Sequence, residues 1–123
     1  MNISSMVDPR IRAELLAGAC AHMPEGSPAL AADEVDRLLA GLDGWVLAGD
    51  RTRLRKQLVA ASFSAAVALF ARIATLADAE DHHPDVHLVS YRHVAIESWT
   101  HTVGALSLND FILAAKIDAL LGG

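Results

Sequence analysis

The stretch SFSAAVALFARIATLAD, residues 62–78, decides how the fold of this chain is predicted. It is rich in alanine, a strong helix former, and contains neither glycine nor proline, so it predicts a helix. Apolar side chains recur along it at helical spacing. The face that we expect to be buried carries Phe63, Val67, Phe70, Ala74 and Ala77. Pro84 then ends the helix, because the residue before a proline is pushed into an extended conformation.

Two strands are predicted beyond this proline, at residues 86–91 and 93–100. Both segments are rich in β-branched and aromatic side chains, which pack well on a sheet. In the second segment the side chains alternate between the two faces of the sheet. One face carries Val94, Ile96 and Ser98, and the other carries His93, Ala95, Glu97 and Trp99.

The flanking segments complete an α+β pattern. A helix is predicted from about residue 31 to Gly41, followed by a hairpin whose strands, residues 45–47 and 54–61, flank Gly49-Asp50. Ser107-Leu-Asn-Asp110 predicts the start of a last helix as a capping box. The order helix, hairpin, helix, hairpin, helix predicts a four-stranded antiparallel sheet with helices packed on one face.

An N-terminal arm precedes this unit. Asp8 and Pro9 are typical of an N-cap and the first residue of a short amphipathic helix. Residues 23–28 contain two prolines and a glycine, which is typical of a linker. We therefore expect an arm and linker over residues 1–28 and a single domain over residues 29–123.

Length, composition and charge exclude several classes of protein. The 123 residues are 53% hydrophobic, enough for one folded domain with a sizeable core. The formal net charge of −5 gives no overall field to attract a phosphate backbone, so nucleic-acid binding is not expected. Arg51, Arg53 and Arg55 would share one face of a strand, which we interpret as a solvated sheet face rather than an anion-binding strip.

The cysteine content and the N-terminal sequence bear on location. Cys20 has no partner for a disulfide within the chain, so a reducing, cytoplasmic compartment fits best. The chain has no signal-peptide pattern and no run of about 18 apolar residues, so we expect no membrane contact.

Five of the six histidines fall between positions 82 and 101. Because imidazole titrates near physiological pH, such a cluster favours general acid–base chemistry, metal ligation or pH sensing. A zinc site needs three or four ligands, and the sequence has neither a His-Glu-x-x-His pair nor a second cysteine, so no metal is expected. Nucleophilic catalysis is also disfavoured, because there is no Gly-x-Ser-x-Gly motif and Cys20 lies in the arm.

Four short motifs surround these histidines. They are Ala77-Asp-Ala-Glu-Asp-His-His-Pro-Asp85, Tyr91, Thr100-His101 and Gly104-Ala-Leu-Ser-Leu-Asn-Asp110. Together they resemble the pterin-4a-carbinolamine dehydratase family, whose members are also known as the dimerization cofactor of a homeodomain transcription factor. The resemblance spans about residues 31–121, because Gly44-Trp45 and the helix before the histidines match the family as well.

The resemblance implies an enzyme that removes water from 4a-hydroxytetrahydropterin to give quinonoid dihydropterin. Three histidines would line the pterin pocket, by motif position His82, His83 and His101, and no redox cofactor would be needed. The chemistry requires a base for the N5 proton and an acid for the departing 4a-hydroxyl, which two imidazoles in opposite states can supply. His87 and His93 have no counterpart in the family, and we interpret them as ordinary strand residues.

Three carboxylates are candidates for contacts with the substrate. Asp81 directly precedes the histidine pair, and Asp78 stands where the family usually has an acidic residue. Asp110 aligns with a residue at the edge of the family's pocket, although the capping box alone also explains a carboxylate there. The adjacent His82 and His83 have a structural alternative too, since cationic side chains favour the C-terminal end of a helix.

The resemblance leaves two classes of function and an oligomer to be tested. The alternative to the enzyme is a non-catalytic, protein-binding member of the same fold, acting as a transcriptional cofactor or an assembly chaperone. All three pocket histidines are present, which favours catalysis. The resemblance also implies a homodimer or homotetramer, and the exposed edges of a small antiparallel sheet favour self-association independently.

Overall fold

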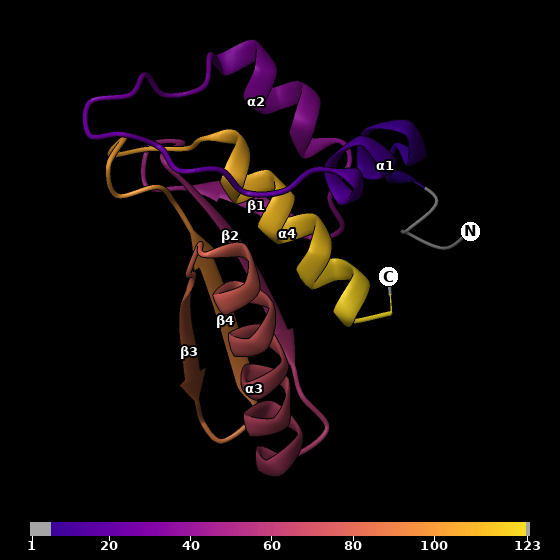
Figure 1. The fold of residues 1–123 in the computed structure, drawn as a ribbon. Coiled ribbons are helices and arrows are strands. Elements are labelled where there is room, and N and C mark those ends of the chain that lie inside the picture. The colour runs from indigo at the N-terminus through magenta and orange to yellow at the C-terminus, as the bar shows by residue number, and fades with distance from the viewer. Residues whose placement is uncertain (1–5, 123) are drawn as a thin grey trace.

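The chain folds into four helices and one four-stranded antiparallel sheet, as a computed structural model that describes residues 6–122 shows (Figure 1). The elements in chain order are α1 (Pro9–Ala17), α2 (Ala32–Leu39), β1 (Trp45–Ala48), β2 (Arg53–Val59), α3 (Phe63–Glu80), β3 (Asp85–Val89), β4 (His93–Ser98) and α4 (Leu108–Leu120). This order confirms the predicted α+β class with a helix ahead of it.

The sheet has the strand order β1-β2-β4-β3, so β4 lies in its centre and β3 at one edge. Leu54 of β2 pairs with Ser98 of β4, and Asp85 of β3 pairs with Glu97 on the opposite side of β4. Val94, Ile96 and Ser98 are buried, whereas His93 is exposed. The face predicted for these three residues is therefore buried as expected, although Ala95 on the other face is buried too.

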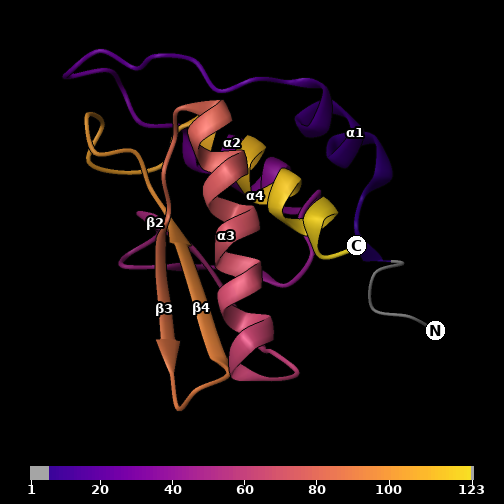
Figure 2. The ribbon, with the colours of Figure 1, turned by 60° about the horizontal axis from the view of Figure 1, so that its bottom comes forward.

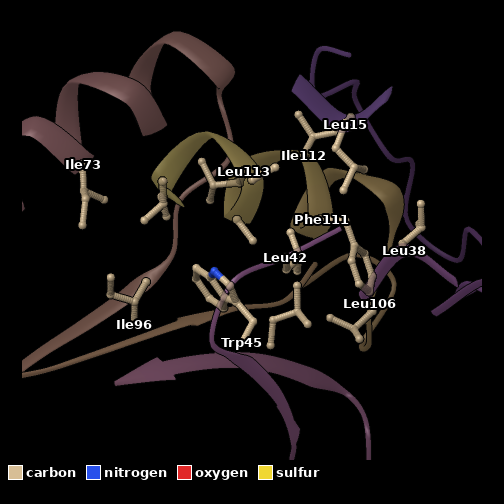
Figure 3. Packing of buried hydrophobic residues seen from close by; sticks show 14 of the residues in the cluster. Leu15, Leu38, Leu42, Trp45, Ile73, Ile96, Leu106, Phe111, Ile112 and Leu113 are labelled. Atoms are coloured by element: carbon tan, nitrogen blue, oxygen red, sulfur yellow. The ribbon is translucent and has the colours of Figure 1, made fainter. Parts of the chain in front are cut away.

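The core lies between one face of the sheet and the helices α3 and α4 (Figures 2 and 3). Helix α4 is its centre, because most of its side chains are buried and Phe111 and Leu113 are completely so. Trp45 and Ile96 reach this layer from the sheet. Apolar burial of this extent is the main force that holds such a fold together.

The buried face of α3 differs from the predicted one. Its buried residues are Ala66, Leu69, Ile73 and Ala77. Phe63 and Val67, which were predicted to be buried, are 55% and 48% exposed. The helix carries apolar side chains of its own on nearly every side, so the periodicity of its sequence does not single out one buried face. Packing against α4 and the sheet selects the face that is buried.

The structure also corrects the prediction that three arginines share one face of a strand. Arg51 lies in the β1–β2 turn with a φ of 69°, and its guanidinium donates to Asp36 Oδ1 at 2.7 Å. Only Arg53 and Arg55 belong to β2, and both form ion pairs with Glu97 of β4. Glu97 thus balances part of the positive charge on this sheet face.

The first helix packs on the core. Asp8 caps it as predicted, since its Oδ1 accepts from the backbone N–H groups of Arg10 at 2.9 Å and Ile11 at 3.3 Å. Leu15 on this helix is 1% exposed and belongs to the core cluster. Residues 18–31, which we name the strap, then run without regular structure from α1 to α2 (Figure 1). No helix within residues 6–122 is long and apolar enough to cross a membrane.

Candidate active site

A cavity of about 340 Å³ lies where the C-terminal end of α3, the end of β4, the first turn of α4 and the strap meet. Its volume is at the lower end of the usual range for small-molecule sites, about 300–1,000 Å³. His82, His83 and His101 all line it, together with Asp81. The fold therefore brings together the three histidines that the sequence predicted.

The backbone at the end of α3 presents the histidine pair. Asp81 adopts a left-handed conformation with φ 53°, which Asp tolerates better than most residues. The N–H of Asp81 donates to Asp78 O at 3.3 Å and the N–H of His82 donates to Ala77 O at 3.1 Å. This Schellman-type ending terminates the helix, so both His82 and His83 follow it outside regular structure, ahead of the proline.

His82 is held by a buried carboxylate. Its Nε2 lies 2.7 Å from Asp110 Oδ1, and its side chain is 11% exposed while that of Asp110 is fully buried. An ionised carboxylate can only accept hydrogen bonds, so Nε2 carries the proton of this contact. Nδ1 is then the ring nitrogen of His82 that is left to exchange a proton with a ligand.

Asp110 is fixed by further donors. Ser98 Oγ donates to its Oδ1 at 2.6 Å, and Thr100 Oγ1 donates to its Oδ2 at 2.8 Å. The backbone N–H of Ser107 donates to Oδ2 at 2.9 Å and completes the predicted capping box. The capping-box interpretation of this carboxylate is therefore confirmed, and the same carboxylate also contacts His82, whereas its contact with the substrate stays a prediction.

The other two histidines stand in more open positions. His83 Nε2 lies 2.9 Å from Asp78 Oδ1, and both side chains are exposed, so this contact holds the ring only weakly. The ring of His101 lies 3.9 Å from that of Trp99 between centroids. The Trp99 ring is covered by the Arg53 guanidinium at 5.0 Å, and this stack limits the positions that the imidazole of His101 can take.

The predicted carboxylates differ in their relation to the cavity. Asp81 lines it, whereas Asp78 and Asp110 contact histidines from outside its lining. His87 and His93 lie on the exposed face of the sheet and do not line this cavity. Among residues 6–122, no three His, Cys, Asp or Glu side chains are grouped so that they could hold a metal ion.

Sequence reasoning missed several contributors to the cavity, among them Trp99, Asn109 and residues 20–23 of the strap, which include His22. Trp99 carried a signal, because a large aromatic residue on a polar strand face directly precedes Thr100-His101. The strap carried no signal, since its composition is that of an ordinary linker.

Cys20 is an unreactive thiol in this setting. Burial, reinforced by the negative charge of Glu80, raises the pKa of Cys20 to about 12. Because of this raised pKa, the thiolate fraction at pH 8 should be about a thousandfold smaller than in the unfolded chain. Only the thiolate is nucleophilic, so the reaction rate should fall with this fraction. We therefore expect a thiol-disulfide reagent to modify the native protein far more slowly than the urea-unfolded protein. Equal rates, followed by absorbance, would contradict this.

The fold and the histidine site define the class to which the chain belongs. The model of the family described as Pterin 4 alpha carbinolamine dehydratase matches residues 28–120. The chain is 39% identical over 112 residues to a putative pterin-4-alpha-carbinolamine dehydratase of Chlorobium limicola, covering 89% of this chain and 98% of that protein. It is 47% identical over 85 residues to the mitochondrial pterin-4-alpha-carbinolamine dehydratase 2 of Arabidopsis thaliana, covering 68% of this chain and 46% of the plant protein.

A solved structure agrees with these matches. The crystal structure of a transcriptional coactivator/pterin dehydratase from Brucella melitensis superimposes with a TM-score of 0.69 at 28% identity. The match covers 75% of this chain and 97% of that one. The chain belongs to the pterin-4a-carbinolamine dehydratase family, an enzyme family, as its motifs predict.

Proposed function

We propose that this protein dehydrates 4a-hydroxytetrahydropterin to quinonoid dihydropterin, and so serves the recycling of tetrahydropterin. The observation that carries the proposal is the His82–Asp110 pair, placed in one cavity with His83 and His101. Four imidazoles line this small cavity, because His22 of the strap joins the three predicted histidines, and imidazoles can supply both a proton acceptor and a proton donor near neutral pH.

We assign the base to His82. It takes the N5 proton while the N5–H electron pair forms the C4a=N5 double bond and the C4a–O bond breaks. The imidazolium that results is stabilised by the buried carboxylate of Asp110, 2.7 Å from its Nε2. A buried carboxylate that orients an imidazole and stabilises its charged form is a recurrent feature of histidine bases.

The acid comes from the open side of the cavity. His83 and His101 are both exposed and line it, so either imidazolium can hand a proton to the departing hydroxyl, which leaves as water. Atoms and electrons balance, because one proton is taken from N5, one is given to oxygen and no electron is transferred. Separate alanine variants of His83 and His101 distinguish the two.

The proposal is tested by following the ultraviolet absorbance of the 4a-carbinolamine, generated by an aromatic amino-acid hydroxylase, with and without this protein. We expect the decay to be accelerated, and chelator-treated protein to retain full activity, because the histidines alone supply the proton transfers. Loss of activity on chelation with recovery on adding zinc would contradict the histidine-only mechanism. An unchanged decay would overturn the enzyme and favour the protein-binding alternative.

We also propose that the protein is a homo-oligomer, with a dimer or a tetramer of dimers expected. The edge strand β3 has one unpaired side, and such an edge pairs with another chain unless it is protected. Helix α3 exposes Phe63 and Val67, which would be covered in an assembly. Light scattering at micromolar concentration should give a multiple of the 13.0 kDa chain mass, and a monomer mass would contradict the proposal while leaving the catalytic one intact.

A further inference from the structure

One wall of the cavity comes from outside the segment that carries the histidines. Residues 20–23 of the strap line the same cavity as His82 and His101. The family model begins only at residue 28, so these residues lie outside the part of the chain that the model matches, although the longer match to the Chlorobium limicola relative takes them in. The strap runs alongside α4 in both views of the ribbon (Figures 1 and 2).

We propose that the strap is a part of the active site: residues 21–23 close one side of the pterin pocket and determine the affinity for the reduced pterin, and Asn109 is the positioning residue that holds them there. This inference rests on the function proposed above. It assigns substrate affinity to a segment that lies outside the three predicted catalytic histidines.

Asn109 binds the strap with both ends of its side-chain amide. The N–H of Ala21 donates to Asn109 Oδ1 at 2.9 Å, and Asn109 Nδ2 donates to the carbonyl of Ala21 at 2.7 Å. Asn109 is 5% exposed, so these two hydrogen bonds are shielded from competing water. The backbone of Ala21 is thereby fixed at the cavity.

Further contacts fix the strap on each side of Ala21. The N–H of Cys20 donates to Glu80 Oε1 at 2.9 Å, and Lys116 Nζ bridges Glu80 Oε2 at 2.7 Å and the carbonyl of Gly18 at 2.8 Å. Toward α2, the N–H of Gly26 donates to the carbonyl of Thr102 at 3.1 Å. The strap is therefore ordered before any ligand binds, which avoids the entropy cost of ordering a loop upon binding.

The anchors of the strap adjoin the groups that hold the base. Asn109 directly precedes Asp110, which orients His82, and Glu80 is two residues before His82. The C-terminal end of α3 and the first turn of α4 thus hold both the strap and His82. The position of the strap relative to His82 is therefore set by rigid elements. Such rigid placement is what a binding site needs to hold a small ligand in one orientation.

Met23 is the strap side chain suited to contact the substrate. It is partly buried and lines the cavity, and its thioether is polarisable and packs favourably against aromatic rings. The stacked rings of Trp99 and His101 line the same cavity. A flat bicyclic pterin between such groups would gain apolar contact in the ground state and in the transition state alike.

The test combines calorimetric titration with the stable 7,8-dihydropterin and steady-state kinetics on full-length variants. Contacts that are equal in ground and transition states change KM and not kcat. We expect Asn109→Ala to raise Kd and KM by about tenfold and Met23→Ala by about threefold or more, each with kcat within about twofold of the parent value. Met6→Ala is the matched control, because Met6 is 79% exposed and does not line the cavity.

The outcomes separate this inference from the proposed function. Parent protein that neither binds dihydropterin nor accelerates dehydration would refute the function itself. Active parent protein with Kd and KM unchanged in Asn109→Ala and Met23→Ala would overturn the role of the strap alone. A fall in kcat at unchanged KM would also overturn it, because the strap would then act on the chemistry. If Asn109→Ala does not fold, Met23→Ala decides on its own.

Discussion

Replacing His82 by alanine is expected to lower kcat for carbinolamine dehydration by at least about tenfold, since a positioned acid or base typically contributes about 10²–10⁴-fold. The variant loses the imidazole that Asp110 holds at 2.7 Å and with it the proposed acceptor of the N5 proton. KM should change less than kcat, because proton transfer occurs only on the way to the transition state. Steady-state kinetics with the generated carbinolamine measure both constants.

Three of the other histidines provide the comparison. His101→Ala is expected to lower kcat by at least about tenfold as well, and a larger loss there than in His83→Ala would assign the acid to His101. His93→Ala is the control, because His93 lies on the exposed sheet face away from the cavity. If His93→Ala were as damaging as His101→Ala, the assignment of the pocket would be wrong.

Asp110→Asn is expected to be the most damaging change outside the histidines. An amide in place of the carboxylate sets an N–H₂ group against the hydroxyl donors of Ser98 and Thr100 and removes the charge beside His82. Leaving buried donors unsatisfied costs about 1–3 kcal/mol in the free energy of unfolding. Losing the stabilised imidazolium should also lower kcat by at least about tenfold.

Asp118→Asn is a matched control for this change. Asp118 is 2% exposed and accepts from Trp45 Nε1 at 2.9 Å and Lys56 Nζ at 2.7 Å, but it does not line the cavity. Its substitution should destabilise the protein at least as much, because it breaks a buried ion pair, without changing kcat. Urea unfolding measures the free energy of unfolding of each variant. Steady-state kinetics, at temperatures where both variants are folded, measure kcat. An equal loss of kcat in both variants would show that Asp110 acts through stability alone.

The order of the secondary structure could be predicted because local signals were strong. Ser62 and Ser107 begin α3 and α4 as helix caps, and the alternation along β4 identified its buried face. The buried face of α3 could not be predicted, because the helix is apolar on nearly every side and only the tertiary packing distinguishes Leu69 from Val67. Local sequence patterns thus predict where a helix or strand lies in the chain more reliably than they predict which of its faces packs against other elements.

The candidate site was predictable to the extent that it lies in short motifs. His82 and His83 are adjacent in the sequence, and the family resemblance joined His101 to them. The link between His82 and Asp110 spans 28 residues and exists only because α4 packs beside the end of α3. The strap could not be foreseen, because its hydrogen bonds to Asn109 join residues 88 positions apart and leave no periodic signal.

The central position of α4 also determines when the chain can fold. Helix α4 is the last element in chain order, yet α1, α3 and the sheet all bury apolar side chains against it. Before residues 108–120 have been synthesised, those earlier elements have no common partner, and isolated hairpins or single helices are marginal in water. A chain that lacks α4 therefore cannot complete this core. It also lacks Asp110, the carboxylate that contacts His82, so the histidine site as described depends on the same helix.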